Sequence, residues 1–450
     1  MAGAGVPPAG LRFGTDGVRA RAGTRLDEPV VRALGAAAAG FLGADRVFVG
    51  RDTRESGPGL SRALAEGLST GGLDVVQMGV VPTPAVAHAA AAGGAAAAMV
   101  SASHNPWQDN GVKLFLAGGL KLDDAVQAAV QDAWDTTPRL EDPVPVDGWS
   151  DEASTEASRR WVDAVVASVR PGALAGLGLV VDCANGATSS LAGGALARLG
   201  ADVTVINSEP DGRNINEGCG STRPGGLQAA VLALGADAGL ALDGDGDRVV
   251  AVGDDGRLLD GDDLLAVCGV DRNERGTLPG STVVVTVMAN LGLRRALDDH
   301  GIAVHETAVG DRYVLEALEA NGWSLGGEQS GHVIFRDLAT TGDGLLTGIQ
   351  ALDAARRADR SLGGRAADLV VRAPQVLHAV PVVGDAAALV AVLAGEIAAA
   401  AAELGDTGRL LVRPSGTEPV VRVMVEAFDA GTASEVAGRL VEAVKRADRT

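Results

Sequence analysis

Residues 99–115 read MVSASHNPWQDNGVKLF, and they contain a pattern that recurs along the chain. The apolar run that ends at Val100 is typical of a buried strand, and GVKLF is typical of a second one. Between them lie two serines, a histidine, an asparagine and a proline, which are polar or turn-forming residues. The stretch therefore predicts a strand, a polar loop and another strand, with more reactive side chains in the loop than a plain turn needs.

Two later stretches repeat this pattern of an apolar strand that runs into a loop of reactive side chains. The loops are DGDGDR at 243–248 and GEQSGH at 327–332. In α/β proteins, ligands bind at the carboxyl ends of the strands. Loops of this kind from three domains would together form one cleft.

Strand-like and helix-like segments alternate along most of the chain, which predicts an α/β fold. We expect three similar α/β domains with mixed, mainly parallel sheets, and a small C-terminal α+β domain, around a central cleft. A Pro-rich, acidic linker is expected at 138–152 and a second join at 358–369. The expected domains are 1–150, 151–258, 259–368 and 369–450.

The composition limits the possible partners. The chain has 450 residues, a formal net charge of -20 and a sequence pI near 4.7. Such an acidic protein repels nucleic acids and anionic membranes, so we expect neither as a partner. The three cysteines are far apart without a CxxC spacing, and the first residues lack the features of a signal peptide. We therefore expect a protein of the reducing cytoplasm.

The loop at 243–248 predicts a metal site. Asp243, Asp245 and Asp247 alternate with glycines, and three carboxylates so close together repel one another unless a cation lies between them. Oxygen ligands in this number suit Mg²⁺ or Ca²⁺. An EF-hand is excluded because Arg248 stands where that loop needs glycine, and Asp254 where it needs glutamate. The remaining alternative is an acidic surface turn.

Two other loops are candidates for ligand binding. GGEQSGH at 326–332 holds Glu328, Ser330 and His332 among glycines, which suits close contact with a polyhydroxylated ligand. A structural loop with a satisfied glutamate is the alternative.

The turn in LLVRPSGTEPVVRVMVE, residues 410–426, combines hydroxyls, backbone N–H groups and guanidinium groups, as a phosphate site does. Its candidate residues are Arg413, Ser415, Gly416, Thr417 and Arg422. A simple hairpin turn would explain the proline and the glycine. It would not explain two arginines in so acidic a chain.

Taken together, six stretches resemble the α-D-phosphohexomutase superfamily over nearly the whole chain. They are FGTDGVR, SASHNPWQDNGVKLF, DGDGDR, VGDRYV, GGEQSGH and RPSGTEPVVRVMVE. The resemblance implies four domains around a deep cleft. It also implies an isomerase that moves phosphate between two positions of a hexose through a bisphosphorylated intermediate. The loops GEQSGH and VGDRYV resemble the members that act on an amino sugar.

The resemblance also implies roles for the residues around the first two loops. Ser103 matches the phosphoserine of the superfamily, and one Mg²⁺ per chain would bind its phosphate together with the three aspartates. Arg19, Arg248 and Lys113 would supply positive charge. His104 and Lys113 are both candidates for proton transfer or for steadying the phosphate, and the sequence does not rank them. A sugar 1,6-bisphosphate would be the activator.

For the phosphosugar, the resemblance implies that the loop at 410–426 binds the phosphate that is not reacting. Glu328 or Asp311 would bind a protonated amino group, and His332 a sugar hydroxyl. A homodimer is a further expectation from the resemblance alone.

Two other functions remain open at this stage. One is a phosphomannomutase/phosphoglucomutase with the same residues. The other is a non-catalytic protein that binds sugar phosphates with a divalent ion, although binding alone needs no serine at 103.

Overall fold

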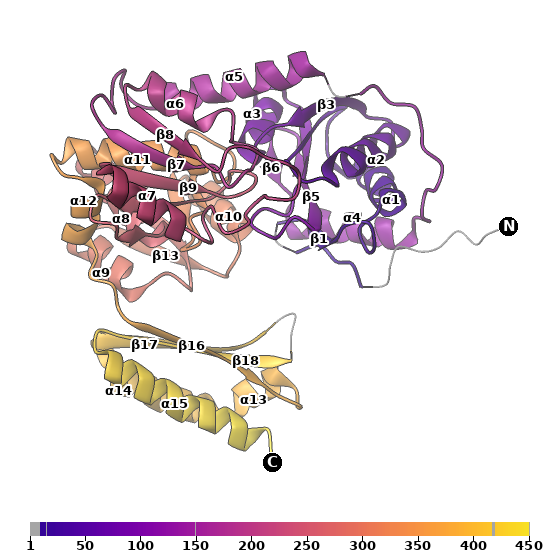
Figure 1. Cartoon of the computed structure of the whole chain (residues 1–450). Helices are drawn as coiled ribbons and strands as arrows, with labels where there is room; N and C mark the ends of the chain where they lie inside the picture. The colour runs from indigo at the N-terminus through magenta and orange to yellow at the C-terminus, as the bar shows by residue number, and fades with distance from the viewer. Residues whose placement is uncertain (1–9, 15, 149, 416–418, 450) are drawn as a thin grey trace. The chain divides into compact units, whose positions relative to one another are not determined.

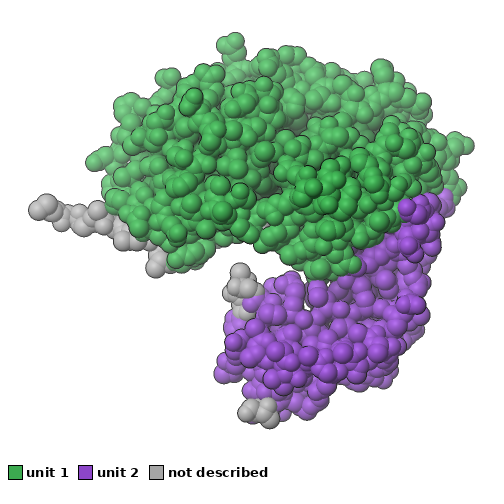
Figure 2. Space-filling view, turned by 180° about the vertical axis from the view of Figure 1, so that it is seen from behind, with its two compact units in different colours: residues 1–288, 302–367 green, residues 289–301, 368–450 purple. Residues whose placement is uncertain are grey.

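The computed structural model describes residues 10–14, 16–148, 150–415 and 419–449. The chain divides into two compact units, which Figure 2 shows in different colours. The first unit contains Met1–Met288 and Ile302–Ala367, and the second contains Ala289–Gly301 and Asp368–Thr450.

The first unit contains three sheets that share one strand order, and each sheet is mixed. Each sheet contains four strands that follow one another in sequence. The first of these four lies between the second and the third and is parallel to both. The fourth strand then pairs antiparallel with the third. The expected three similar α/β domains with mixed sheets are confirmed, but the sheets are not mainly parallel, because antiparallel pairs are as many as parallel ones.

The strands follow this order along the chain (Figure 1). The first sheet has β1 (Val18–Arg21), β2 (Arg46–Arg51), β3 (Asp74–Val80), β4 (Ala96–Val100), β5 (Asp109–Leu116) and β6 (Leu120–Lys121). The second has β7 (Gly178–Asp182), β8 (Asp202–Ile206), β9 (Ala238–Leu242), β10 (Val249–Gly253) and β11 (Leu258–Leu259). The third has β12 (Thr282–Thr286), β13 (Ala303–Thr307), β14 (Leu325–Gly327) and β15 (Val333–Phe335). Strands β4, β9 and β12 are buried at every residue, which explains why they are continuous apolar runs.

Helices connect the parallel strands. The first sheet carries α1 (Glu28–Ala38), α2 (Gly57–Thr70), α3 (Thr83–Gly93) and α4 (Asp124–Thr136), and the second carries α6 (Ala192–Arg198) and α7 (Gly225–Leu234). The third has α8 (Gly261–Glu274), α10 (Asp311–Asn321), α11 (Gly344–Arg357) and α12 (Leu362–Leu369). Helix α5 (Asp151–Ala167) begins where the expected linker ends and packs on α3, β3 and α6.

Aspartates begin many of these helices, so part of the negative charge has a structural role. Asp27 and Asp123 accept a hydrogen bond from a backbone N–H in the first turn of α1 and α4, respectively. Asp260 forms a capping box at α8, and Asp343 caps α11. A carboxylate at this position satisfies an unpaired N–H and also interacts favourably with the helix dipole.

The expected join at 358–369 is largely helical. Helix α12 covers most of it and buries Leu362 and Ala366, while the division between the two units falls next to Ala367.

The second unit is a small α+β fold, as the sequence predicts. Its antiparallel sheet has β18 (Val420–Ala427) between β16 (Gln375–Pro381) and β17 (Gly408–Pro414). Helices α13 (Ala386–Val392), α14 (Ala394–Leu404) and α15 (Ala430–Ala447) pack on this sheet, as the lower part of Figure 1 shows. Among the described residues no single helix is long and apolar enough to cross a membrane. Helices α13 and α14 pass that test only as a pair, and they are bent by 61°.

Helix α9 (Leu291–Asp299) belongs to the second unit, although it lies between two strands of the third sheet in sequence. Its N-cap residue, Asn290, donates to the carbonyl of Ala373 at 3.0 Å and to Glu426 Oε1 at 3.2 Å. The Leu291 N–H donates to the other oxygen of Glu426 at 2.9 Å. The fully buried Glu426 carboxylate therefore attaches α9 to β18.

Candidate active site

The three predicted loops lie at the same position of their sheets. Each loop connects a parallel strand to the next strand in sequence, which runs antiparallel to it. The three pairs are β4 and β5, β9 and β10, and β14 and β15. They also meet, because the Ser103 hydroxyl contacts Asp243 and the Val249 N–H donates to the carbonyl of Gly331 at 3.1 Å. The repeated topology thus places the candidate residues of all three loops in one region of the first unit.

Ser103 is buried at the tip of the β4–β5 loop, with φ at 51°, in the left-handed region. Its Oγ donates to Asp243 Oδ2 at 2.5 Å and lies 3.3 Å from His104 Nδ1. A non-glycine residue in this conformation is uncommon and is often found at functional sites. The conformation directs the hydroxyl toward the acidic loop.

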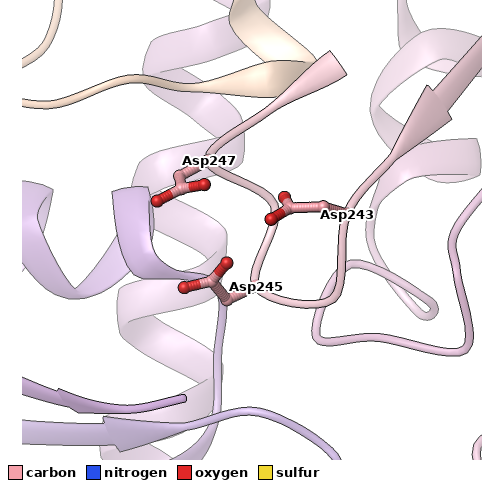
Figure 3. A group of neighbouring side chains, drawn as sticks. All are labelled: Asp243, Asp245 and Asp247. Carbon is pink, nitrogen blue, oxygen red and sulfur yellow. The ribbon is translucent and has the colours of Figure 1, made fainter. Parts of the chain in front are cut away.

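Asp243, Asp245 and Asp247 are buried, and their carboxylates point toward a common space (Figure 3). One oxygen from each lies within 4.8 Å of the others. Gly246, with φ at 75°, allows the tight turn, and a Cβ there would lie 2.6 Å from Thr188 Cγ2. Asp245 Oδ1 and Asp247 Oδ1 accept no hydrogen bond from the described residues. Buried oxygens of this kind need a cation, so the residues fit a hard divalent ion such as Mg²⁺.

The first carboxylate of the loop is the one that is hardest to ionise without such an ion. Burial raises the pKa of Asp243 well above its usual value, and the charges of Asp247 and Asp245 raise it further. Burial also acts on Asp247, but Lys113 and His332 hold the pKa of Asp247 well below its usual range. A bound divalent cation would favour the ionised form of all three, so its binding should release a proton.

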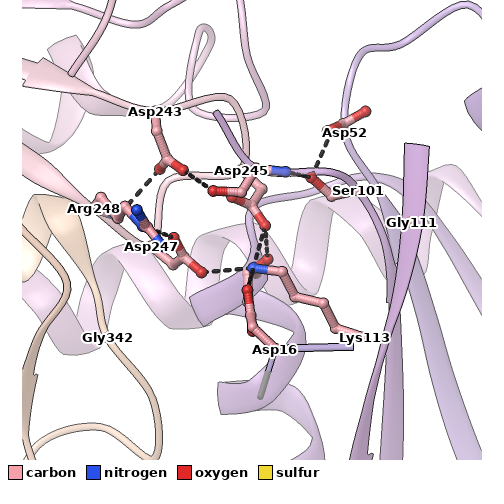
Figure 4. A network of polar contacts seen from close by, with 12 residues as sticks. Asp16, Asp52, Ser101, Gly111, Lys113, Asp243, Asp245, Asp247, Arg248 and Gly342 are labelled. Carbon is pink, nitrogen blue, oxygen red and sulfur yellow. Dashed lines mark hydrogen bonds and ion pairs between the residues drawn. The ribbon is translucent and has the colours of Figure 1, made fainter. Parts of the chain in front are cut away.

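Lys113 lies at the centre of these charges (Figure 4). Its Nζ lies 2.6 Å from Asp247 Oδ2, 2.9 Å from Asp245 Oδ2 and 3.0 Å from Asp16 Oδ2. Burial alone would lower the pKa of Lys113, but these three carboxylates raise it well above its usual value. Lys113 is therefore a fixed positive charge in this arrangement rather than a proton acceptor.

The other predicted residues of the first two loops lie close by. Arg19 Nη2 pairs with Asp16 at 2.6 Å, and the backbone N–H of Arg248 donates to Asp243 Oδ1 at 3.1 Å. The Arg248 Nε is 3.8 Å from Asp247 Oδ1. Burial and the charges of Arg248 and Arg19 lower the pKa of His104 to about 4, so its imidazole is neutral at pH 7. Of the two candidates for proton transfer, His104 rather than Lys113 is therefore unprotonated and able to accept a proton.

His332 and Asp311 are buried and connected to other charged groups. His332 Nδ1 lies 3.7 Å from Asp247 Oδ2, and its Nε2 accepts from the Gly342 N–H at 3.2 Å. Asp311 Oδ2 pairs with Lys121 at 2.7 Å. Both residues are therefore occupied by protein contacts, and their roles in sugar recognition stay predictions.

Glu328 and Ser330 lie nearer the surface. Glu328 Oε1 accepts from the Gly310 N–H at 3.1 Å, and the exposed Ser330 hydroxyl is 3.5 Å from Glu328 Oε2. Glu328 forms no direct ion pair among the described residues, unlike Asp311, although its charge acts on Arg248 at longer range. Glu328 is the more available carboxylate for an amino group.

The predicted phosphate loop belongs to the second unit. Arg413 on β17 and Arg422 on β18 face each other directly in the antiparallel register. Burial and Arg422 lower the pKa of Arg413. Like charges opposite each other on a sheet are unfavourable, which suits a site for an anion. The Ser415 N–H donates to the Val420 carbonyl at 3.0 Å, whereas Gly416 and Thr417 lie outside the described residues.

The sequence analysis did not identify several side chains that support this site. Asp16 pairs with Lys113, Arg19 and Lys121, and Arg54 and Asn216 bind the Ser103 loop. A signal existed for one of them: Arg54 follows β2 in RDTRES, a run of polar residues at the carboxyl end of a parallel strand. Asn216 and Lys121 carry no comparable signal.

Mg²⁺ should stabilise the protein through the three aspartates. We expect millimolar Mg²⁺ to raise the melting temperature of chelator-treated protein, because an ion that binds only the folded state adds its binding free energy. Asp245→Asn should abolish most of this increase. Calorimetry in two buffers of different ionisation enthalpy should reveal the released proton, with more protons released and weaker binding as the pH falls. An equal temperature shift in Asp245→Asn would contradict the assignment.

Family models match four consecutive parts of the chain. They are described as phosphoglucomutase/phosphomannomutase alpha/beta/alpha domain I for residues 10–140, domain II for 159–256 and domain III for 260–372. The model of the C-terminal domain matches residues 370–443.

Similar proteins match over almost the full length. The phosphoglucosamine mutase of Saccharopolyspora erythraea is 49% identical over 440 residues, which cover 96% of this chain and 98% of that protein. The phosphoglucosamine mutase of Thermobifida fusca is 49% identical over 444 residues, with 96% and 98% coverage.

Solved structures share the fold. A phosphoglucomutase/phosphomannomutase family protein from Burkholderia thailandensis superimposes with a TM-score of 0.79 at 28% identity, covering 96% of this chain and 97% of that one. An N-acetylphosphoglucosamine mutase from Aspergillus fumigatus, solved with GlcNAc-6P and magnesium, gives a TM-score of 0.69 at 18% identity, with 99% and 97% coverage.

Proposed function

Since the chain belongs to the phosphoglucomutase/phosphomannomutase family, we propose that it acts as a phosphoglucosamine mutase. It would interconvert glucosamine 6-phosphate and glucosamine 1-phosphate. The observation that carries this proposal is the buried Ser103 hydroxyl, 2.5 Å from a carboxylate of the three-aspartate loop. A serine in this place is the group that a phosphoryl transfer through the enzyme requires.

The reaction then consists of two transfers. In the first, the bond between phosphorus and Ser103 Oγ breaks, and a bond forms to the free hydroxyl of the sugar monophosphate, which loses its proton. The product is a sugar 1,6-bisphosphate. In the second transfer, the other phosphoryl group moves to Ser103 Oγ, and the sugar oxygen that it leaves takes up a proton. The enzyme is phosphorylated again, and the phosphate has changed position.

The residues of the first unit divide this work. Asp243, Asp245 and Asp247 would hold one divalent ion, which when bound supplies charge that stabilises the phosphoryl group and the serine oxygen. Lys113 pairs with both Asp245 and Asp247 and lowers the pKa of Asp247. His104, whose pKa of about 4 leaves it neutral, is 3.3 Å from Ser103 Oγ and is the better placed base. Arg19 and Arg248 add the positive charge that an anionic substrate needs.

The remaining assignments concern the sugar. We assign Glu328 to the protonated amino group, because its carboxylate forms no direct ion pair among the described residues and interacts with Arg248 only at longer range. Arg413, Ser415 and Arg422 are assigned to the phosphate that is not reacting, together with Gly416 and Thr417.

We further propose a cytoplasmic protein whose product enters the synthesis of UDP-N-acetylglucosamine and cell-wall precursors. The three cysteines are buried and unpaired, which agrees with a reducing compartment. A homodimer and activation by a sugar 1,6-bisphosphate are parts of the same proposal.

The test is mutase turnover with Mg²⁺ and a trace of hexose 1,6-bisphosphate. Glucosamine, glucose and mannose phosphates should be compared in one assay. We expect kcat/KM to favour the glucosamine phosphate by about tenfold or more, because a hydroxyl can still donate a hydrogen bond to the carboxylate but lacks the positive charge of the ammonium group. Equal or better rates with glucose or mannose phosphate would assign the protein to the phosphomannomutase/phosphoglucomutase activity instead. Absence of turnover with all three would contradict both.

A further inference from the structure

The left-handed backbone of Ser103 requires an explanation from its surroundings. With φ at 51°, this residue pays a conformational penalty that glycine would avoid. The loop around it, residues 101–108, contains no helix or strand that could hold the conformation. Such a backbone persists only where neighbouring groups fix it.

The first of these groups is Arg54, which is fully buried behind the loop. Its five N–H bonds all have acceptors. Nε donates to Asp52 Oδ2 at 2.8 Å, and the two terminal nitrogens donate to four backbone carbonyls of the loop and its end. These carbonyls belong to Ser103 at 2.8 Å, Asn105 at 2.9 Å, Pro106 at 2.5 Å and Asp109 at 3.0 Å.

Asp52 extends the same support to the amide side of Ser103. Its carboxylate accepts from the Ser101 hydroxyl at 2.7 Å, and the Ser101 Oγ in turn accepts from the Ser103 N–H at 2.8 Å. Both backbone polar groups of Ser103 are therefore fixed from the β2–α2 loop. The contact between Asp52 and Ser101 is drawn in Figure 4.

The second group comes from the sheet that carries the aspartate loop. Asn216 lies between β8 and α7, and its side-chain Nδ2 donates to the Ser103 carbonyl at 2.9 Å and to the Asn105 carbonyl at 3.1 Å. Asn216 has φ at 58°, a conformation that asparagine tolerates better than most residues. Gly244 of the aspartate loop lies beside this contact, since a Cβ there would be 2.8 Å from the Ser103 carbonyl oxygen.

We propose that Arg54 and Asn216 form a clamp on the Ser103 carbonyl that positions Oγ for phosphoryl transfer. This inference rests on the proposed function. Arg54 follows β2 in the first sheet, which also carries the Ser103 loop, whereas Asn216 belongs to the second sheet, which carries the three aspartates. The clamp therefore fixes Oγ relative to both sheets. Because Oγ is the leaving group in one transfer and the acceptor in the next, one geometry must serve both steps. Arg54 and Asn216 are positioning residues, and neither contacts the reacting atoms.

Asn216→Gly tests the clamp without disturbing the backbone, because glycine accepts the left-handed conformation. We expect kcat to fall about 10- to 100-fold, the cost of a misplaced reacting group, with KM for the sugar phosphate within about twofold. The melting temperature and its increase with Mg²⁺ should stay close to those of the unaltered protein. Asp359→Gly is the matched control, because Asp359 is an exposed left-handed residue with φ at 55°.

A second measurement does not depend on turnover. Hydrogen exchange of residues 101–108 in Asn216→Gly should be about tenfold faster than in the unaltered protein and in Asp359→Gly, because the loop has lost two hydrogen bonds. Unchanged exchange in this loop would overturn the clamp even if the protein is not a mutase. An active parent protein with unchanged kcat in Asn216→Gly would overturn it as well, and would leave the proposed function intact.

Arg54→Lys extends the test to the other half of the clamp. Lysine keeps the charge beside Asp52 but cannot reach four carbonyls in the plane of a guanidinium group. We expect a larger loss of kcat than in Asn216→Gly, with faster exchange over the same residues. If Arg54→Lys does not fold, the two measurements on Asn216→Gly decide.

Discussion

Ser103→Ala should reduce mutase turnover about 10⁴-fold or more, the loss expected when a covalent catalyst is removed. Ser103 Oγ contacts Asp243 at 2.5 Å. Another buried hydroxyl, Thr83 Oγ1, contacts Asp245 at 2.6 Å from the start of α3, so it would have to replace Ser103 from a different position. Alanine adds no volume at this buried position, so the fold should be retained. The increase in melting temperature with Mg²⁺ should also persist, since the three carboxylates remain.

A phosphate-labelling experiment separates this loss from a general defect. Incubation with a labelled hexose 1,6-bisphosphate should transfer label to the unaltered protein, and to Ser434→Ala, but not to Ser103→Ala. Ser434 is a suitable control because it is an exposed serine on α15. Label on the Ser103→Ala protein, or turnover within tenfold of the parent, would contradict the assignment of the phosphoserine.

Lys113→Met should have the largest effect on stability. The substitution leaves the buried Asp245 and Asp247, and the partly buried Asp16, without the cation that contacts all three. Removal of one partner from a buried ion pair typically costs about 3–5 kcal/mol. We expect a clear decrease in the urea midpoint without Mg²⁺, and a partial recovery with saturating Mg²⁺, because a bound divalent cation replaces part of the lost positive charge.

The control for this prediction is a lysine with a similar partner at the surface. Lys445 lies 2.8 Å from Glu442, and both side chains are exposed. Lys445→Met should change the stability by less than about 1 kcal/mol, since exposed ion pairs contribute little. Similar urea midpoints for the two variants would show that Lys113 does not balance the buried carboxylates.

The sequence was most informative where a buried strand meets a polar loop. Runs such as AAAAMV and AGLAL predict strands because both faces of β4 and β9 are covered, which leaves no position for a polar side chain. The loops that follow these strands then appear as abrupt changes of composition. This is why the loop that holds Ser103 and the loop of the three aspartates could be identified from composition, whereas Ser103 itself was singled out by the resemblance to the superfamily.

The supporting contacts could not be predicted in this way. Arg54 and Asn216 lie 49 and 113 positions from Ser103, and Lys121 lies 105 positions from Asp16. Pairings over such distances follow from how the sheets are arranged, and no local periodicity records them. The contacts of α9 with β18 carry no sequence signal for the same reason: its sequence is that of an ordinary helix between two parallel strands.

The attachment of α9 to the second unit has a consequence for the order of events during translation. Asn290 precedes its partner Glu426 by 136 positions. At about 5–20 residues per second, the ribosome needs roughly 7–27 s to synthesise the intervening chain. During that interval the nascent helix lacks its contact with β18, although Ala373, the other partner of Asn290, is only 83 positions away and is made earlier. The third sheet must therefore form around a segment that does not yet have all of its permanent contacts. Chains that terminate before β18 would keep α9 in this state, which makes them natural substrates for chaperones and proteases.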